Sequence, residues 1–317
     1  MQHENIGLNM LKVIMILFVI FIHENPTYST HGEFIMWWHS IVVVAVPVFF
    51  TLSGYFFFKG ISFFGYDIYK KKIKKRIKSL FVPYILWNCM PIVFVFAGNL
   101  YSIIFRDKST EALYSFFRQL WDDGIWHIWW DKTSGLMPFD SPLWYVRDLI
   151  ILCIFSPIIY WIIHRIGWLF PIIVGALYLT PLSFPVGFSS TGILFFSIGA
   201  TFATKSMALD VIPKLGQIII LLFAICSFIL CNVYGNIWHK IFLIFSCYSW
   251  ILLFHVLNGS LIERVAKYSE TVFFTLALHN IFVLANVGKI LSLFLPNNFS
   301  YWLAPFITLF ICVLLYY

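Results

Sequence analysis

Two ionisable residues, Lys12 and His23, lie eleven positions apart within one hydrophobic stretch near the N-terminus. A charged side chain at the centre of a bilayer costs about 2.5–3.5 kcal/mol on insertion scales, so such residues indicate function. A histidine that titrates near neutral pH can remove a hydroxyl proton as a general base. A lysine can stabilise an oxyanion or bind a phosphate, or it can extend its ammonium group to the membrane surface as an anchor. His23 is therefore the candidate base, a plain interfacial histidine is the alternative, and both roles of Lys12 stay open.

The composition predicts the elements that hold these two residues. Only 11% of the residues are charged and the mean hydropathy is +0.88, whereas soluble domains carry about 25% charged residues. We therefore predict an all-α, polytopic integral membrane protein, a single domain over residues 1–317, in which about ten transmembrane helices enclose a central cavity. The predicted helices cover residues 8–23, 34–58, 79–101, 142–163, 168–182, 188–204, 214–233, 237–257, 271–294 and 299–317.

The first hydrophobic stretch resembles a secretion signal in its position only. It lacks a basic segment before it and a small-residue cleavage site after it, so we predict that it is retained as a helix. The six cysteines all lie in hydrophobic segments and form no Cys-x-x-Cys pair. This pattern predicts neither a disulfide framework nor a metal site.

Basic residues predict the orientation of the chain. Residues 70–78 are nearly all Lys or Arg, and connections rich in these residues face the cytoplasm. Alternating the helices from this connection puts both termini in the cytoplasm. Lys12 then lies in the inner half of its helix, and His23 lies about 16 Å further out at 1.5 Å per residue. The same count predicts that His279 lies at inner or middle depth, near Lys12.

Two further charged residues, Arg147 and Asp148, are adjacent in a predicted helix. The count of residues from the cytoplasmic side places them toward the outer side, at the depth of His23. Neighbouring residues on a helix point about 100° apart and do not face each other. We therefore expect that these two side chains do not pair and that one of them faces His23.

Three strings accompany the Lys12 and His23 pair: VPVFFTLSGYF at residues 46–56, KRIKSLFVPY at residues 75–84 and SPLWYVR at residues 141–147. In this order they resemble the membrane-bound acyltransferase family 3, whose members include O-acetyltransferases of surface polysaccharides. The resemblance covers nearly the whole chain, because it extends to Phe195-Phe196-x-x-Gly199 and to Leu278-His279. The family has Arg where this chain has Lys12, and more often Arg than Lys at positions 75 and 78, and each replacement keeps the positive charge.

The resemblance implies an enzyme that transfers an acyl group, with acetyl expected, from cytoplasmic acyl-CoA to a hydroxyl group. The implied acceptor is a glycan or lipid-linked saccharide that faces away from the cytoplasm, and the implied location is the bacterial inner membrane. No bound cofactor is expected, because acetyl-CoA or another acyl-CoA is a substrate. The expected catalytic residues are His23 and Lys12, the expected donor contacts are Lys75, Arg76, Lys78 and His279, and the expected acceptor contacts are Tyr55, Trp126, Trp144 and Arg147.

Several of these assignments have a plain structural alternative. The basic run can be only a signal for topology and anionic lipids. The tryptophans in the connection of residues 102–140 can form an interfacial belt, as is usual, or a surface that stacks on sugars. His279 can be a core histidine bonded to a carbonyl group. The basic run has no interleaved aromatic residues, so nucleic-acid binding is not predicted.

Two other function classes fit a polytopic chain with a polar cavity. A transporter or flippase of a glycan intermediate would lose flux, but not acetylation, when His23 is changed to Ala. A membrane sensor or assembly factor would tolerate the change. Inverted hydropathy repeats with broken helices at matching positions, which are typical of transporters, are not apparent.

Overall fold

The computed structural model describes residues 6–24, 32–61, 63–106, 110–123, 128–129, 137–182 and 184–317. Within these ranges the regular structure is helical and no strand occurs, which confirms the predicted all-α class. The chain divides into two compact units that alternate along the sequence. The first unit is Met1–Gly65, Phe155–Ser183 and Ser190–Tyr317, and the second is Tyr66–Ile154 and Phe184–Ser189.

Every one of the ten predicted membrane segments coincides with helix, but their lengths differ. In the described ranges seven helices are long and apolar enough to cross a membrane: Ile6–His23, Phe34–Phe58, Tyr66–Arg106, Lys214–Cys231, Asn236–His255, Ser260–Phe294 and Asn298–Tyr316. A pair bent by 65°, Ser141–Ile154 and Ser156–Ile166, makes up to eight if it is one span. The fifth and sixth predicted segments are the shorter apolar helices Leu169–Leu179 and Ser190–Thr204.

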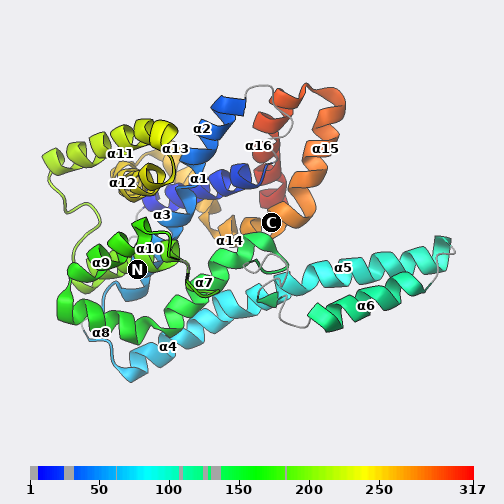
Figure 1. The fold of residues 1–317 in the computed structure, drawn as a ribbon, viewed down its shortest axis with the longest axis horizontal. Coiled ribbons are helices and arrows are strands. Elements are labelled where there is room, and N and C mark those ends of the chain that lie inside the picture. The colour runs from blue at the N-terminus through cyan, green and yellow to red at the C-terminus, as the bar shows by residue number, and fades with distance from the viewer. Residues whose placement is uncertain are drawn as a thin grey trace. The chain divides into compact units, whose positions relative to one another are not determined.

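The first unit is built around α1, which packs against helices from both ends of the chain (Figure 1). Ten of its 18 residues are buried, which explains why its sequence is hydrophobic on all sides. The elements of this unit are α1 (Ile6–His23), α2 (Gly32–Val42), α3 (Ala45–Phe58), α8 (Ser156–Ile166), α9 (Leu169–Leu179), α10 (Ser190–Thr204), α11 (Lys214–Tyr234), α12 (Asn236–His255), α13 (Ser260–Ala266), η5 (Lys267–Thr271), α14 (Val272–Leu278), η6 (His279–Leu284), α15 (Ala285–Phe294) and α16 (Asn297–Tyr316).

Two glycines let α3 and α10 approach closely. A Cβ atom on Gly54 would lie 2.2 Å from the backbone oxygen of Phe196, and a Cβ atom on Gly199 would lie 1.9 Å from the backbone oxygen of Thr51. Small residues at helix contacts are typical of membrane proteins, because packing of backbone on backbone replaces the missing hydrophobic driving force. The close approach expected from the string at residues 46–56 is therefore present.

Helices α11 and α12 lie side by side as a hairpin that is joined at Gly235 (Figure 1). Gly235 has a φ of 81° and donates its backbone N–H to the carbonyl of Cys231 at 3.0 Å. Glycine ends helices in this way because it adopts the left-handed conformation without a steric penalty. Much of α11 is exposed and apolar, as expected of a helix that faces lipid.

The second unit consists of α4 (Tyr66–Arg76), η2 (Ile77–Phe81), α5 (Val82–Arg106), α6 (Glu111–Asp123), η4 (Ser141–Leu143) and α7 (Trp144–Ile154). The first three form one continuous helical run, with a π-helical segment between the basic helix α4 and the apolar helix α5. Helix α6 returns along α5, where the rings of Phe96 and Phe117 meet with centroids 5.7 Å apart (Figure 1).

Candidate active site

A polar cavity of about 250 Å³ lies at the end of α1 in the first unit, where His23 is the last residue of the helix. The imidazole of His23 is half-buried and lines this cavity. Most of the lining residues carry polar side chains, which is unusual inside a unit with so few charges. The lining consists of His23, Glu24, Asn280, Leu284, Ala285, Gly288, Lys289, Ser292, Ser300 and Tyr301.

A second imidazole, that of His279, faces His23. The ring centroids are 5.3 Å apart and the ring planes are tilted by 54°. The prediction that His279 lies at the depth of Lys12 is therefore wrong. The depth count assumed a regular helix from residue 271, whereas the helical run begins at Ser260 and contains both a 3-10 segment and a π-helical segment.

Glu24 contributes a carboxyl group to the same cavity, directly after the end of the membrane span. Partial burial raises the pKa of Glu24 to about 7, because the charged form loses hydration. Its Oε1 atom lies 3.6 Å from the position that a Cβ atom on Gly288 would take. A Cβ atom at this position would make only an ordinary contact with the carboxyl group, so α15 packs directly beside Glu24 at this wall of the cavity.

Lys12 lies on the same face of α1 as His23, since eleven residues are close to three full turns, and about 16 Å away along the axis. Its Nζ donates to the Oδ1 atom of Asn9 at 2.8 Å and lies 5.4 Å from the ring centroid of Phe56. The ammonium group thus points away from His23. The lysine and the histidine therefore lie toward opposite ends of one helix face, as the sequence predicts.

Tyr55, an expected acceptor contact, is buried in α3 and does not line the His23 cavity. The Nζ atom of Lys59 lies 5.4 Å from its ring centroid and 5.8 Å from that of Phe56. Because Lys12 faces the ring of Phe56 as well, the tyrosine belongs with the Lys12 end of α1. This placement argues against an acceptor contact by Tyr55 beside His23.

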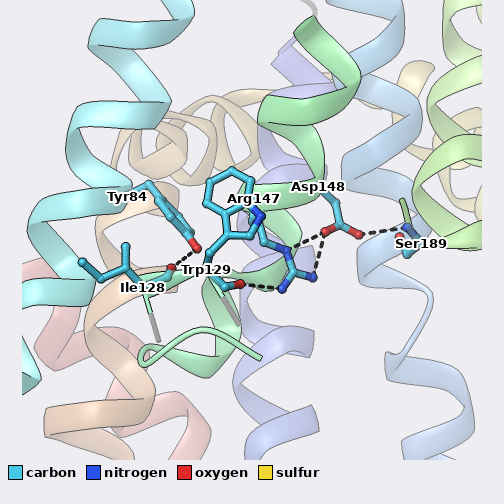
Figure 2. A network of polar contacts seen from close by, with 6 residues as sticks. All are labelled: Tyr84, Ile128, Trp129, Arg147, Asp148 and Ser189. Carbon is cyan, nitrogen blue, oxygen red and sulfur yellow. Dashed lines mark hydrogen bonds and ion pairs between the residues drawn. The ribbon is translucent and has the colours of Figure 1, made fainter. Parts of the chain in front are cut away.

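The second unit holds a closed network around Arg147 and Asp148, which Figure 2 shows. Arg147 donates from Nε and Nη2 to Oδ1 of Asp148 at 3.0 and 2.9 Å, and from Nη1 to the carbonyl of Trp129 at 2.9 Å. The other carboxylate oxygen of Asp148 accepts the backbone N–H of Ser189 at 3.2 Å. The prediction that these neighbours do not pair is wrong, because the long arginine side chain folds back to its neighbour even though the two Cβ atoms diverge.

Tyr84 and Asn88 of α5 extend the polar groups of the second unit, and Figure 2 shows Tyr84 beside Ile128. Tyr84 donates its hydroxyl proton to the carbonyl of Ile128. Asn88 donates to the carbonyl of Tyr84 at 2.8 Å and accepts the backbone N–H of Asp140 at 3.0 Å. The side chain of Asp140 is fully buried, and neither of its carboxyl oxygens has a partner among the described residues. Burial raises the pKa of Asp140 to about 8, so this acid is protonated at neutral pH.

The remaining predicted site residues lie in the second unit. Lys75 at the end of α4 and Lys78 in η2 are exposed, and Arg76 between them is half-exposed. Trp144 is half-buried at the first position of α7. Trp126 lies outside the described residues. Helix α4 carries most of the basic run and η2 carries Lys78, so these side chains project from a helical surface that the sequence pattern alone did not indicate.

The family model described as an acyltransferase domain, Acyl_transf_3, matches residues 5–317. The chain belongs to this acyltransferase family. The acyltransferase is also 23% identical over 171 residues to the succinoglycan biosynthesis protein ExoH of Rhizobium meliloti (strain 1021). That match covers 50% of the acyltransferase and 43% of ExoH, so the shared region spans less than half of the relative. No solved structure matches the acyltransferase.

The family resemblance found in the sequence is thereby confirmed, and the long apolar helices support the expected multi-pass membrane protein. The structure adds cavity residues of the acyltransferase that sequence reasoning missed, namely Glu24, Asn280, Lys289, Ser300 and Tyr301. The only signal for them was position: Glu24 follows His23, and Asn280 follows His279. The others come from helices whose proximity to His23 requires the fold.

Proposed function

We propose that the acyltransferase moves an acyl group, with acetyl the expected one, from cytoplasmic acyl-CoA to a hydroxyl of a glycan or lipid-linked saccharide on the other side of the membrane. The observation that carries this proposal is the half-buried imidazole of His23 on the wall of a polar cavity. The partial similarity to a protein named for succinoglycan biosynthesis supports a glycan acceptor. The basic run at residues 70–78 supports a multi-pass arrangement in the bacterial inner membrane with both termini in the cytoplasm.

In the proposed reaction, neutral His23 accepts the proton of the acceptor hydroxyl as its oxygen attacks the thioester carbonyl carbon. The C–S bond then breaks, and the sulfur of CoA leaves with the proton that His23 returns. The products are an ester on the acceptor and free CoA thiol, so atoms and charge balance. The polar lining of the cavity supplies donors and acceptors for the other hydroxyl groups of a sugar, and its small volume suits one sugar residue at a time.

The geometry of α1 favours one of the two catalytic roles considered for Lys12. A separation of about 16 Å along the axis, with the ammonium group turned toward Asn9, keeps Lys12 away from a carbonyl that reacts at His23. We therefore assign Lys12 to a phosphate or to the polar arm of the donor. The phosphates of CoA are assigned to the exposed side chains of Lys75 and Lys78 together with Arg76. Exposed cations attract negatively charged phosphates from solution.

The direct test compares surface glycans of the host by mass spectrometry with the unchanged protein, without it, and with His23→Ala. Loss of the acetyl mass increment in the last two samples is expected. His164→Ala is the matched control, because His164 is an exposed histidine of the same unit that stacks on Tyr160. An acetyl increment that persists with His23→Ala contradicts the proposal. A fall in exported glycan with unchanged acetylation per sugar supports a flippase instead.

A further inference from the structure

The buried imidazole of His279 has an unused acceptor. Its Nδ1 lies 3.0 Å from the carbonyl oxygen of Thr275 and 2.9 Å from that of Leu276. Carbonyl oxygens only accept, so Nδ1 carries the ring proton. Nε2 has no hydrogen-bond partner among the described residues, and the side chain is fully buried. A proton on Nε2 would leave an unpartnered buried charge, which is costly, so this nitrogen holds a lone pair.

The spacing of the two rings suits a bond from His23 to this lone pair. A linear N–H···N bond of about 3 Å between two five-membered rings puts their centroids slightly more than 5 Å apart, and the observed separation is 5.3 Å. Nε2 of His279 has no partner among the described residues, so the ring of His23 must turn for this bond to close. His23 borders the cavity and is only half-buried, so its ring has room to turn, whereas His279 is held by two carbonyl groups.

We propose that His279 is a positioning residue that fixes the ring orientation and the tautomer of His23 by accepting its N–H at Nε2. A neutral imidazole has one donor and one acceptor. Once the donor is directed to His279, the lone pair of His23 faces the cavity, where the acceptor hydroxyl would bind. This inference rests on the proposed role of His23 as the base. It replaces the expected donor contact of His279 with a role that acts through His23.

Other ionisable and polar groups around His23 define what else could orient it. Glu24 follows it on the chain, and Lys289 on α15 and Tyr301 on α16 line the cavity. His39 on α2 is close enough to interact with it electrostatically. The carboxyl group of Glu24 turns toward Gly288. Ser300 also lines the cavity and is buried with no partner for Oγ among the described residues, but no hydrogen bond fixes its hydroxyl, whereas His279 is held by two carbonyl groups.

The kinetic test uses H279L and H279Q in proteoliposomes, with acetyl-CoA as donor and the deacetylated host glycan as acceptor. H279L removes the acceptor atom, and kcat is expected to fall about 10²-fold with KM for both substrates nearly unchanged, since a misplaced catalytic group costs this much. H279Q places an amide oxygen near the position of Nε2 and is expected to recover at least about tenfold of that loss. A normal kcat in H279L, or a loss expressed only as a higher KM for acetyl-CoA, overturns the inference.

A second measurement does not depend on turnover. In protein labelled with ¹⁵N-histidine and embedded in bilayers, the His23 ring is expected to show one neutral tautomer by solid-state NMR. A mixture of tautomers is expected in H279L, with the single form restored in H279Q, while H164L leaves the His23 signal unchanged. The same tautomer distribution in the unchanged protein and H279L refutes the positioning role, even if H279L folds poorly. Failure of the proposed function is seen separately, as full activity of His23→Ala.

Discussion

Ionisable groups lie among apolar helices both in the His23 cavity of the first unit and in the Arg147 network of the second unit. The two regions differ in how many of their hydrogen-bond donors and acceptors have partners. Arg147 and Asp148 direct their charged atoms at each other, at Trp129 and at Ser189. His279 keeps a buried lone pair free of any described partner, and His23 borders a cavity. The comparison teaches that a saturated buried charge holds structure together, whereas an unsaturated group beside a cavity is available for chemistry.

A substitution at the His23 cavity should lower activity without lowering stability. His23→Gln is expected to lower kcat/KM by about 10²- to 10⁴-fold, the usual contribution of a general base. Because His23 is only half-buried at a cavity, the melting temperature in detergent should stay nearly constant. Radiolabelled acetyl transfer and thermal unfolding measure the two quantities. A variant that unfolds early while each folded molecule retains full turnover would contradict the assignment.

The network of the second unit should show the opposite response. Arg147→Met leaves the buried carboxylate of Asp148 without its cation, and breaking such a pair costs about 3–5 kcal/mol of unfolding free energy. The double variant with Asp148→Asn should regain most of this loss, since the amide oxygen still accepts the N–H of Ser189. Arg106→Met, at an exposed helix end, is the control and should change stability by less than about 0.5 kcal/mol. If Arg147→Met is as stable as Arg106→Met, the network does not contribute to the stability of the folded protein.

Asp140 is the exception within the second unit, because its carboxyl oxygens have no partner in the described part of the chain. Its pKa is raised to about 8, so the folded state holds its proton up to that pH while the unfolded state releases it near pH 4. Stability of the unchanged protein therefore falls as pH rises from about 4 to 8. Asp140→Asn removes this dependence and should stabilise the protein by about 2–4 kcal/mol at pH 8. Denaturation across that pH range tests the expectation against Asp67→Asn, an exposed carboxylate of α4.

Charge on the exposed basic run should affect donor binding only. The double variant Lys75→Gln with Lys78→Gln is expected to raise KM for acetyl-CoA by about tenfold at low salt, with kcat retained, because exposed cations attract phosphates through a screened field. The difference should shrink at high salt. Lys205→Gln removes another exposed cation and serves as the control. If the double variant and this control have the same KM for acetyl-CoA, the basic run does not bind the donor and only determines the membrane topology.

The smallest expected effect concerns Glu24. Its pKa is raised to about 7, so the folded state binds the proton more tightly than the unfolded state between about pH 4.5 and 7, and stability falls as pH rises through this window. After discounting for water that reaches the side chain, Glu24→Gln should gain about 1 kcal/mol relative to the unchanged protein at pH 8 and nothing at pH 4. Melting temperatures of both proteins at these two pH values test this expectation. A stability gain that is the same at pH 4 and pH 8 would rule out the titration of Glu24 as its cause.

Hydropathy was sufficient to locate the long apolar helices, because long apolar runs in a membrane protein have few alternatives. It did not predict α4, which is rich in lysine, or α6, which lies within the predicted connection of residues 102–140. Lys12 and His23 were selected as candidates because they are ionisable residues within one hydrophobic stretch. The sequence was insufficient where depth depended on the start of a helix: the run that carries His279 begins at Ser260 and not at residue 271, and it brings His279 beside His23. It was also insufficient where the fold gathers distant residues, since Lys289 and Tyr301 reach the cavity only through the packing of α15 and α16.

The π-helical segment η6 sets the rotational phase of everything that follows it. An extra residue per turn between His279 and Leu284 means that removing one residue there would restore a regular helix, and α15 would swing by about 100° around its axis. Gly288 and Lys289 would then leave the cavity while His279 stayed in place. The widened turn thus acts as a spacer, and its residue count, more than its side chains, keeps Gly288 and Lys289 at the cavity that His23 lines.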